Sequence, residues 1–238
     1  MNWKAVVFPM LAVLLVGGIY LFIVFKQREE PGVQQKQAEQ HVNPDDLAVV
    51  RQMYPAHFDD VQELAGKSVW MKNGYTIPYY PYAGGRVDFA KQAGVLAPAQ
   101  RLDVKKAIKA VVPASVDDKI AHGSHQAMLV FTFPGSTELY ATPTGFEQGE
   151  QEQYFCDLLY FYDDPHGIYN NWSKDMWTAV DAHQPKQGMN ELQMSLTLGM
   201  NTQSDSQSVG NRTVTYDVNG KKTTVTFIND KATTIQNQ

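Results

Sequence analysis

An uninterrupted apolar run at residues 5–25 is the feature that most constrains this chain of 238 residues. It reads AVVFPMLAVLLVGGIYLFIVF and contains no charged residue. At a helical rise of about 1.5 Å per residue, its 21 residues span roughly 31 Å, which matches the hydrocarbon core of a bilayer. A buried helix of a soluble protein normally has a polar face, and this run has none. We therefore expect residues 1–25 to form a membrane-spanning signal anchor.

A cleaved signal peptide is the alternative interpretation of the same run. Val16 and Gly18 are small enough for a cleavage site, but cleavage there would leave IYLFIVF on the mature chain. No A-x-A sequence follows residue 25, and no nearby cysteine permits lipoprotein processing. The retained anchor is the better interpretation.

The charges beside the run bear on its orientation. Lys4 precedes it, and three basic residues within 26–36 follow it, a count that slightly favours a cytoplasmic body. Two glutamates at 29–30 follow at once, however, and a four-residue N-terminal tail is ordinary for a signal anchor. We expect the body of the protein to lie outside the cytoplasm.

Residues 26–44 are polar and glutamine-rich, with almost no large apolar side chains. Such a stretch buries too little surface to offset the entropy of ordering it, so it is expected to be a flexible linker. Residues 45–186 then carry twelve basic and eighteen acidic residues, a net charge of −6. Because this charge repels phosphate, nucleic acid is not an expected partner.

Residues 45–165 have the pattern of a β-rich domain. Five strand-like runs are separated by turn-forming residues: 67–74, 101–112, 126–133, 138–146 and 154–162. This spacing predicts a small barrel or sandwich. Val69, Leu129, Phe131 and Leu159 are expected in its core.

Three segments of this region have a helical pattern, and one of them also fits a strand. The run 101–112 fits a strand or a helix. Residues 45–54 and 58–66 have short helical patterns, the second ending at Gly66.

A connecting helix is predicted within residues 166–186. Ser173 is a good N-cap for KDMWTAVDAH. Trp172 and Trp177 then occupy the two positions of a hydrophobic staple, so both are expected to be packing residues.

The stretch GMNELQMSLTLG at 188–199 predicts a short, strongly capped helix. With Asn190 as N-cap, Gln193 completes a capping box, and Met189 and Met194 form a staple. Gly199 is the expected helix stop. A helix of two turns is marginal in water, so it needs a partner sheet.

That sheet is predicted immediately downstream. NRTVTYDV alternates with period two, Asn-Gly at 219–220 is a strong hairpin turn, and KKTTVTFI returns. This turn places Val214 opposite Val225 and Tyr216 opposite Thr223. A three-residue loop at 229–231 is expected, which would place Ile235 opposite Val225, whereas a two-residue loop would turn Ile235 outward. Residues 187–238 thus form an expected α-β-β-β module, and the whole chain is expected to be α+β. Because 52 residues seldom fold stably alone, the module should depend on its neighbours.

The two segments 188–199 and 210–235 resemble the BamE/SmpA (OmlA) family of outer-membrane assembly lipoproteins. The matching positions are Gly188, Met189, Gln193, Leu198, Gly199, Tyr216, Gly220, Val225 and Phe227. The resemblance covers about the last fifty residues and implies the fold of this module, a bacterial envelope address and a protein-contact role. In that family a lipidated cysteine anchors the chain, whereas here the apolar run takes its place. Gly66, Val69 and Trp70, with GVLAP at 94–98, are faintly similar to SH3-like bacterial domains.

Few residues suggest chemistry. His122 and His125 in HGSH, and Asp163, Asp164 and His166 in DDPH, are the only close groupings, and neither has the spacing of a known zinc site. Exposed loop histidines and a turn are the expected roles. Cys156 is the single cysteine and is expected to be a buried, inert thiol. IPYYPY at 77–82 could stack on a ligand or simply cover a barrel mouth.

Two functions therefore remain open. The first is a non-enzymatic protein anchored in the bacterial inner membrane through residues 5–25, with a periplasmic body that contacts another protein or the cell wall. No metal or cofactor is expected for it. The alternative is an envelope hydrolase or metal-dependent enzyme that uses His122, His125, Asp163, Asp164 and His166.

Overall fold

The computed structural model describes residues 20–22, 43–72, 76–218 and 220–237. Contacts divide the chain into two units, Met1–Asp46 and Leu47–Gln238. The expected membrane span and linker lie outside the described residues, apart from a helical turn at 20–22 and residues 43–44. Within the described ranges, no helix is long and apolar enough to cross a bilayer.

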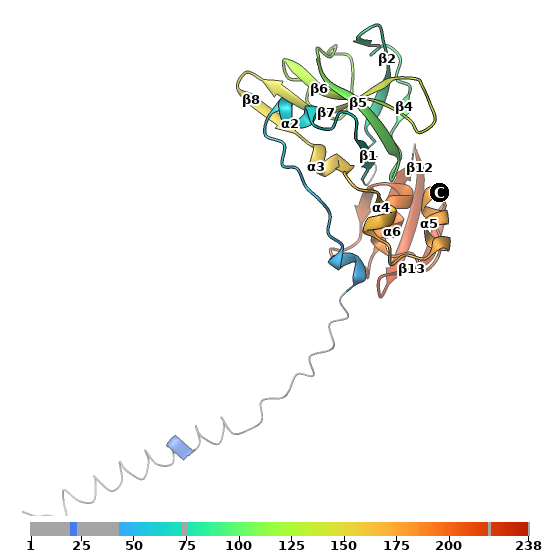
Figure 1. Cartoon of the computed structure of the whole chain (residues 1–238). Coiled ribbons are helices and arrows are strands. Elements are labelled where there is room, and N and C mark those ends of the chain that lie inside the picture. Colours follow the sequence, from blue (N-terminus) through green and yellow to red (C-terminus); the bar gives the residue numbers. More distant parts are fainter. Residues whose placement is uncertain (1–19, 23–42, 73–75, 219, 238) are drawn as a thin grey trace, which may run out of the picture. The chain divides into compact units, whose positions relative to one another are not determined.

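The described part of the chain is α+β, with more strands than helices (Figure 1). Its helical elements are η1 (Pro44–Leu47), α2 (Phe58–Gln62), α3 (Cys156–Leu159), α4 (Pro165–Ile168), α5 (Lys174–Asp181) and α6 (Glu191–Leu198). The larger sheet contains β1 (Ser68–Met71), β2 (Pro78–Ala83), β3 (Arg86–Val87), β4 (Gly94–Val95), β5 (Arg101–Ala110), β6 (His125–Thr132), β7 (Tyr140–Gln148), β8 (Gln151–Tyr154) and β9 (Tyr160–Phe161). The smaller sheet contains β10 (Asn201–Ser204), β11 (Thr213–Val218), β12 (Lys221–Ile228) and β13 (Lys231–Asn237).

The larger sheet follows the order β3-β2-β7-β6-β5-β1-β9, and β4 pairs with β2 while β8 pairs with β7. Its strand pairs are antiparallel. The segment from β4 to β5 therefore touches β2 at its start and β6 and β1 at its end. This connection makes the sheet curl around one core.

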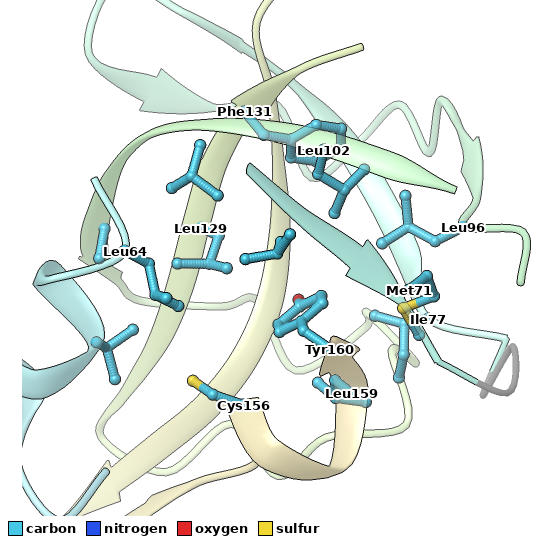
Figure 2. Packing of buried hydrophobic residues seen from close by; sticks show 14 of the residues in the cluster. Leu64, Met71, Ile77, Leu96, Leu102, Leu129, Phe131, Cys156, Leu159 and Tyr160 are labelled. Atoms are coloured by element: carbon cyan, nitrogen blue, oxygen red, sulfur yellow. The ribbon is translucent and has the colours of Figure 1, made fainter. Parts of the chain in front are cut away.

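Alternation along the strands builds that core. Val69, Leu129, Phe131 and Leu159 are all at most 2% exposed, which confirms their predicted burial. Figure 2 shows Leu129 and Phe131 gathered with residues from the neighbouring strands and from α3. On the opposite face of the sheet, a smaller cluster forms around Tyr80, Tyr82, Met128, Val130 and Ala141.

The run 154–162 was predicted as one strand, and this prediction is wrong. Cys156–Leu159 forms helix α3, and only Tyr160–Phe161 continues as strand β9. The reason lies in which side chains are buried. Cys156 and Leu159 are buried three residues apart, whereas Leu158 is 50% exposed, a helical spacing rather than a strict alternation.

The helical pattern predicted for 45–54 is also wrong beyond its start. Only η1 forms, and the chain then runs without regular structure to residue 56. The Asp157 carboxylate accepts hydrogen bonds from the N–H groups of Met53 and Tyr54, both at 2.8 Å. These bonds satisfy two N–H groups that a helix would need, and Tyr54 has a left-handed φ of 52°. Burial would raise the pKa of Asp157, but these bonds and one from the Tyr162 hydroxyl outweigh it and lower the pKa.

Two other expectations from the middle region have clear outcomes. Residues 101–110 form strand β5, because both β1 and β6 pair with this segment. The helix predicted near 58–66 is present as α2, and Gly66 follows it with a φ of 78°. The Asp60 carboxylate accepts from the Ala56 and His57 N–H groups and so fixes the start of α2.

The caps predicted for the two longer helices are confirmed. The Ser173 hydroxyl accepts from the Met176 N–H at the start of α5. The rings of Trp172 and Trp177 are both buried, with centroids 4.7 Å apart. In α6 the Asn190 side chain accepts from the Gln193 N–H at 2.8 Å, and the Gln193 side chain accepts from the Asn190 N–H at 2.9 Å.

Asn190→Ala is expected to lower the free energy of unfolding by about 1 kcal/mol, because the Gln193 N–H loses its acceptor. Asn190→Asp keeps an acceptor and should cost much less. Urea unfolding followed by tryptophan fluorescence measures both variants. Equal losses in the two would contradict the capping role.

The smaller sheet confirms the predicted hairpin. Val214 pairs with Val225, and Tyr216 pairs with Thr223. The second reversal differs from the expectation, because Asn229 and Asp230 form a two-residue loop with φ values of 52° and 57°. A register shift between Thr226 and Phe227 then returns Ile235 to the position opposite Val225. The expected pairing is therefore right, although the loop that was expected to produce it is wrong.

Gly220 is a sharp test of the first hairpin. Its φ is 83°, a region that β-branched residues strongly disfavour. We expect Gly220→Val to lower the free energy of unfolding by about 1–3 kcal/mol. Gly220→Asn should be tolerated much better, since asparagine visits this region. Thermal unfolding of the two variants provides the comparison, and an unchanged Gly220→Val protein would contradict the turn.

A second core joins the smaller sheet to the rest of this unit. Tyr216 and Phe227 pack with Trp177 of α5 and with Phe161 of β9. Trp70 pairs with Phe161 across β1 and β9 and also packs against this core. The expected dependence of residues 187–238 on their neighbours is consistent with this shared core.

Candidate binding pocket

His122 and His125 have separate surroundings. The His122 Nε2 atom lies 3.4 Å from Oδ1 of Asp118, a carboxylate that is buried in the β5–β6 loop. Asp118 also accepts from the Ile120 N–H at 3.3 Å. His125 begins β6 with an exposed side chain. His122 thus contributes to the packing of a loop, and His125 lies beside it on the surface.

Asp163, Asp164 and His166 are engaged with other parts of the fold. Asp163 forms an ion pair with Arg51 at 3.3 Å. Asp164 caps α4 by accepting from the His166 N–H, and it also lies 2.8 Å from the His166 Nδ1 atom. The other ring nitrogen of His166 lies 3.2 Å from Asp181. The turn predicted at DDPH is thus the start of a short helix.

These residues do not assemble into a metal centre. Across the ranges that the structure describes, no group of three or more histidine, cysteine, aspartate or glutamate side chains could hold a metal ion. The alternative hypothesis needed HGSH and DDPH to combine, and the structure does not bring them together in such a group.

His166 gives stability a pH dependence. Burial would lower its pKa, but hydrogen bonds to Asp164 and Asp181 outweigh this effect and raise it. A raised folded-state pKa means that the stabilisation is complete below the unfolded value of about 6.5 and is lost as pH rises through the folded value. The imidazole is 43% exposed, so we expect a loss of less than about 1 kcal/mol. His166→Gln should lack this step in urea unfolding between pH 5 and 9. A step of equal size in both proteins would contradict this assignment.

The single thiol is in an apolar setting. Cys156 is 1% exposed and lies 3.4 Å from the Thr144 hydroxyl. Burial raises the pKa of this thiol to about 11, so little thiolate is present at neutral pH. This surrounding favours a packing role for Cys156.

IPYYPY forms a strand rather than a loop. Most of it lies in β2, where Tyr80 and Tyr82 are buried in the smaller cluster on the opposite face of the larger sheet. Tyr79 turns to the other face and packs edge-on against Phe131 and Tyr140. The tyrosines therefore build the two faces of the sheet, and their buried rings do not form an open stacking platform.

A pocket of about 210 Å³ lies where the β4 segment meets the ends of α5, α6 and β11. Its apolar wall comes mainly from Leu96, Pro98 and Leu198. Its polar groups come from residues that the sequence did not single out as candidates, chiefly His183 and Asp217. The remaining lining residues are Thr76, Val95, Ala97, Thr197 and Gly199.

His183 occupies an unusual backbone position in this pocket. It directly follows the C-cap of α5, with a φ of 52°, while its N–H bonds to the Val180 carbonyl and the Gln184 N–H bonds to the Ala179 carbonyl. Glycine is the usual residue at such a helix end because it has no Cβ. Histidine is one of the non-glycine residues that enter this region more often, at some backbone cost.

The ring of His183 has a defined tautomer when it is neutral. Its Nδ1 atom lies 3.1 Å from the Thr197 carbonyl oxygen, which can only accept. The proton of the neutral ring therefore sits on Nδ1, and Nε2 remains as an acceptor.

Asp217 is the one acidic residue among the lining residues that the structure describes, and none of these is a lysine or an arginine. One of its oxygens accepts from the Gly220 N–H at 2.8 Å, which holds the carboxylate beside the hairpin turn. Lys222 stands opposite Asp217 in the strand pair, but no ion pair within 4 Å joins them among the residues described. The pocket thus combines an apolar wall with acceptors and one negative charge.

The sequence contained partial signs of this pocket. Asp217 precedes the predicted Asn-Gly turn, and Leu198 and Gly199 form the predicted helix stop. Nothing in the local pattern related them to residues 95–98, which come from another strand of the chain.

No family model, curated protein or solved structure matches this chain. The BamE/SmpA resemblance of the last fifty residues therefore stays a prediction from the residues that carry it.

Proposed function

We propose that this chain is a non-enzymatic, membrane-anchored protein of the bacterial envelope, and that its folded region contacts another protein. The apolar run 5–25 supports the anchor in the inner membrane. The envelope address that the BamE/SmpA resemblance implies supports a periplasmic body. The cell wall is the other contact that the sequence left open.

The observation that carries this proposal is the packing of the BamE-like positions. Met189, Tyr216, Val225 and Phe227 match the family pattern and are all at most 1% exposed in one core. The pattern thus coincides with the physical core of the module, which supports a BamE/SmpA-like fold with a protein-contact role.

The larger sheet supports a finer assignment of the middle region. The curl produced by the β4–β5 connection is the arrangement expected of a small, SH3-like barrel. A fold does not by itself imply a function, so this likeness concerns the architecture of the middle region and not its role.

Membrane topology tests the first part of the proposal. A reporter that is active only outside the cytoplasm, fused after Gln238, should be active, and the fusion should stay in the membrane after a carbonate wash. Replacing Leu14 and Leu15 by arginine should release or destabilise the fusion. A stable but inactive wild-type fusion would reverse the orientation.

A partner capture tests the second part. The full chain with its anchor should be cross-linked in intact cells and purified from membranes, with the arginine-substituted anchor as the matched control. The expected result is a defined envelope protein that is lost in the control. Stoichiometric zinc in the purified protein would instead favour the enzyme hypothesis.

A further inference from the structure

We propose that the pocket between β4 and the ends of α5, α6 and β11 binds a lysine side chain of a partner protein. This inference rests on the proposed function only in taking the partner to be a protein. The size of the pocket, its apolar wall and its set of acceptors each support a lysine side chain.

The size of the pocket fits one side chain. Its volume of about 210 Å³ is smaller than the roughly 300–1,000 Å³ typical of pockets for small-molecule ligands and cofactors. Leu96, Pro98 and Leu198 provide a wall against which four methylene groups can pack. Long cationic side chains bury their stems in this way and keep the charged end near polar groups.

The polar groups of the pocket fit an ammonium group. The Asp217 carboxylate offers acceptor oxygens, and the His183 ring offers Nε2 as an acceptor when Nδ1 holds its single proton. A lysine ammonium has three donors and no acceptor, so it complements both groups. An anionic ligand would meet the Asp217 carboxylate, and the lining residues within the described ranges include no lysine or arginine to offset it.

The lack of lysine and arginine among the described lining residues also distinguishes two sources of an amine. The side-chain amine of a cell-wall diamino acid stands beside a carboxylate of its own, which this pocket would repel. A lysine of a protein has its carboxylate in the peptide bond. The lining residues therefore favour a protein lysine.

The backbone of His183 supports a role for its ring in binding. A left-handed conformation at a non-glycine residue is costly, and such residues cluster at functional sites. His183 has this conformation beside the pocket, with its ring fixed on the Thr197 carbonyl. Glycine would satisfy the same helix end without a ring.

The test uses the full chain in a neutral maltoside detergent, because charged or choline headgroups would compete. Nuclear magnetic resonance follows the amides of Leu198 and Asp217 while Nα-acetyl-lysine methylamide is added. Nα-acetyl-norleucine methylamide, which has the stem without the ammonium, is the matched probe. We expect saturable shifts with the lysine probe and at least tenfold weaker binding of the norleucine probe.

Two variants separate binding from folding. Asp217→Asn should weaken binding of the lysine probe about tenfold. Asp117→Asn, which neutralises a carboxylate that is 84% exposed, should leave the binding of this probe unchanged. His183→Gly suits the helix end, so it should fold at least as well as the wild type and still bind the probe more weakly.

Equal binding of both probes, or undiminished binding in Asp217→Asn, would overturn the proposal. Tighter binding of a diamino-acid peptide with a free carboxylate would contradict the claim that the bound amine belongs to a protein lysine. These outcomes are independent of membrane topology. A cytoplasmic body would therefore refute the proposed function but would not change the measured binding of the lysine probe.

Discussion

Leu129→Ala is expected to lower the free energy of unfolding by about 2–5 kcal/mol. Leu129 lies in the middle of β6 and is 0% exposed, with β5 and β7 paired on its two sides. Truncating it removes apolar contacts and leaves a cavity in a core that the flanking strands prevent from collapsing.

Leu158→Ala is the matched control, because this leucine lies in α3 with its side chain 50% exposed. Its loss should be below about 0.5 kcal/mol. Urea unfolding of both variants measures the difference. Similar losses at the two positions would mean that the assignment of the core is wrong.

Glu191→Ala is expected to lower the free energy of unfolding by about 3–5 kcal/mol. Glu191 is 8% exposed at the start of α6, and its carboxylate accepts two bonds from Arg212 Nε and one from Nη2 at 2.7 Å. It also accepts from the Gly210 N–H. Removing it leaves the largely buried guanidinium with the Ser206 carbonyl but without its anionic partner, and it leaves the Gly210 N–H without this acceptor. It also removes a negative charge from a helix N-terminus.

A double replacement sharpens this prediction. Glu191→Leu combined with Arg212→Met removes both charges, so it should recover much of the stability lost in Glu191→Ala. Asp117→Ala is the control for an exposed ion pair, since Asp117 contacts Lys119 at 3.4 Å on the surface, and its loss should be within about 1 kcal/mol. A double variant as unstable as Glu191→Ala would show that packing, rather than the unpaired charge, causes the loss.

The sequence by itself determined the elements whose causes are local. The caps at Ser173 and Asn190 depend on residues within three positions, and both form as predicted. The pairing of Val214 with Val225 follows from a two-residue turn and the period of a strand. The burial of Leu129 and Phe131 follows from an apolar run long enough to fill one strand.

Only the tertiary structure decided the elements whose partners are distant in the chain. Residues 45–54 have a helical pattern, yet only η1 forms, because Asp157, about a hundred residues away, accepts the N–H groups of Met53 and Tyr54. Residues 156–159 became a helix because the core required two side chains on one side, three positions apart. Local preferences are worth a few tenths of a kcal/mol per residue, and such contacts exceed them.

The candidate pocket is the clearest case of an arrangement that the sequence did not reveal, because its residues are distant in the chain. Its wall comes from the β4 segment, its histidine from the end of α5 and its carboxylate from β11. Each residue also has a local role, in a turn, at a helix end or in a strand. Their convergence depends on how the larger sheet and the terminal module pack within Leu47–Gln238. That packing is set by buried long-range contacts, such as the one between Trp70 and Phe161, which no local pattern encodes.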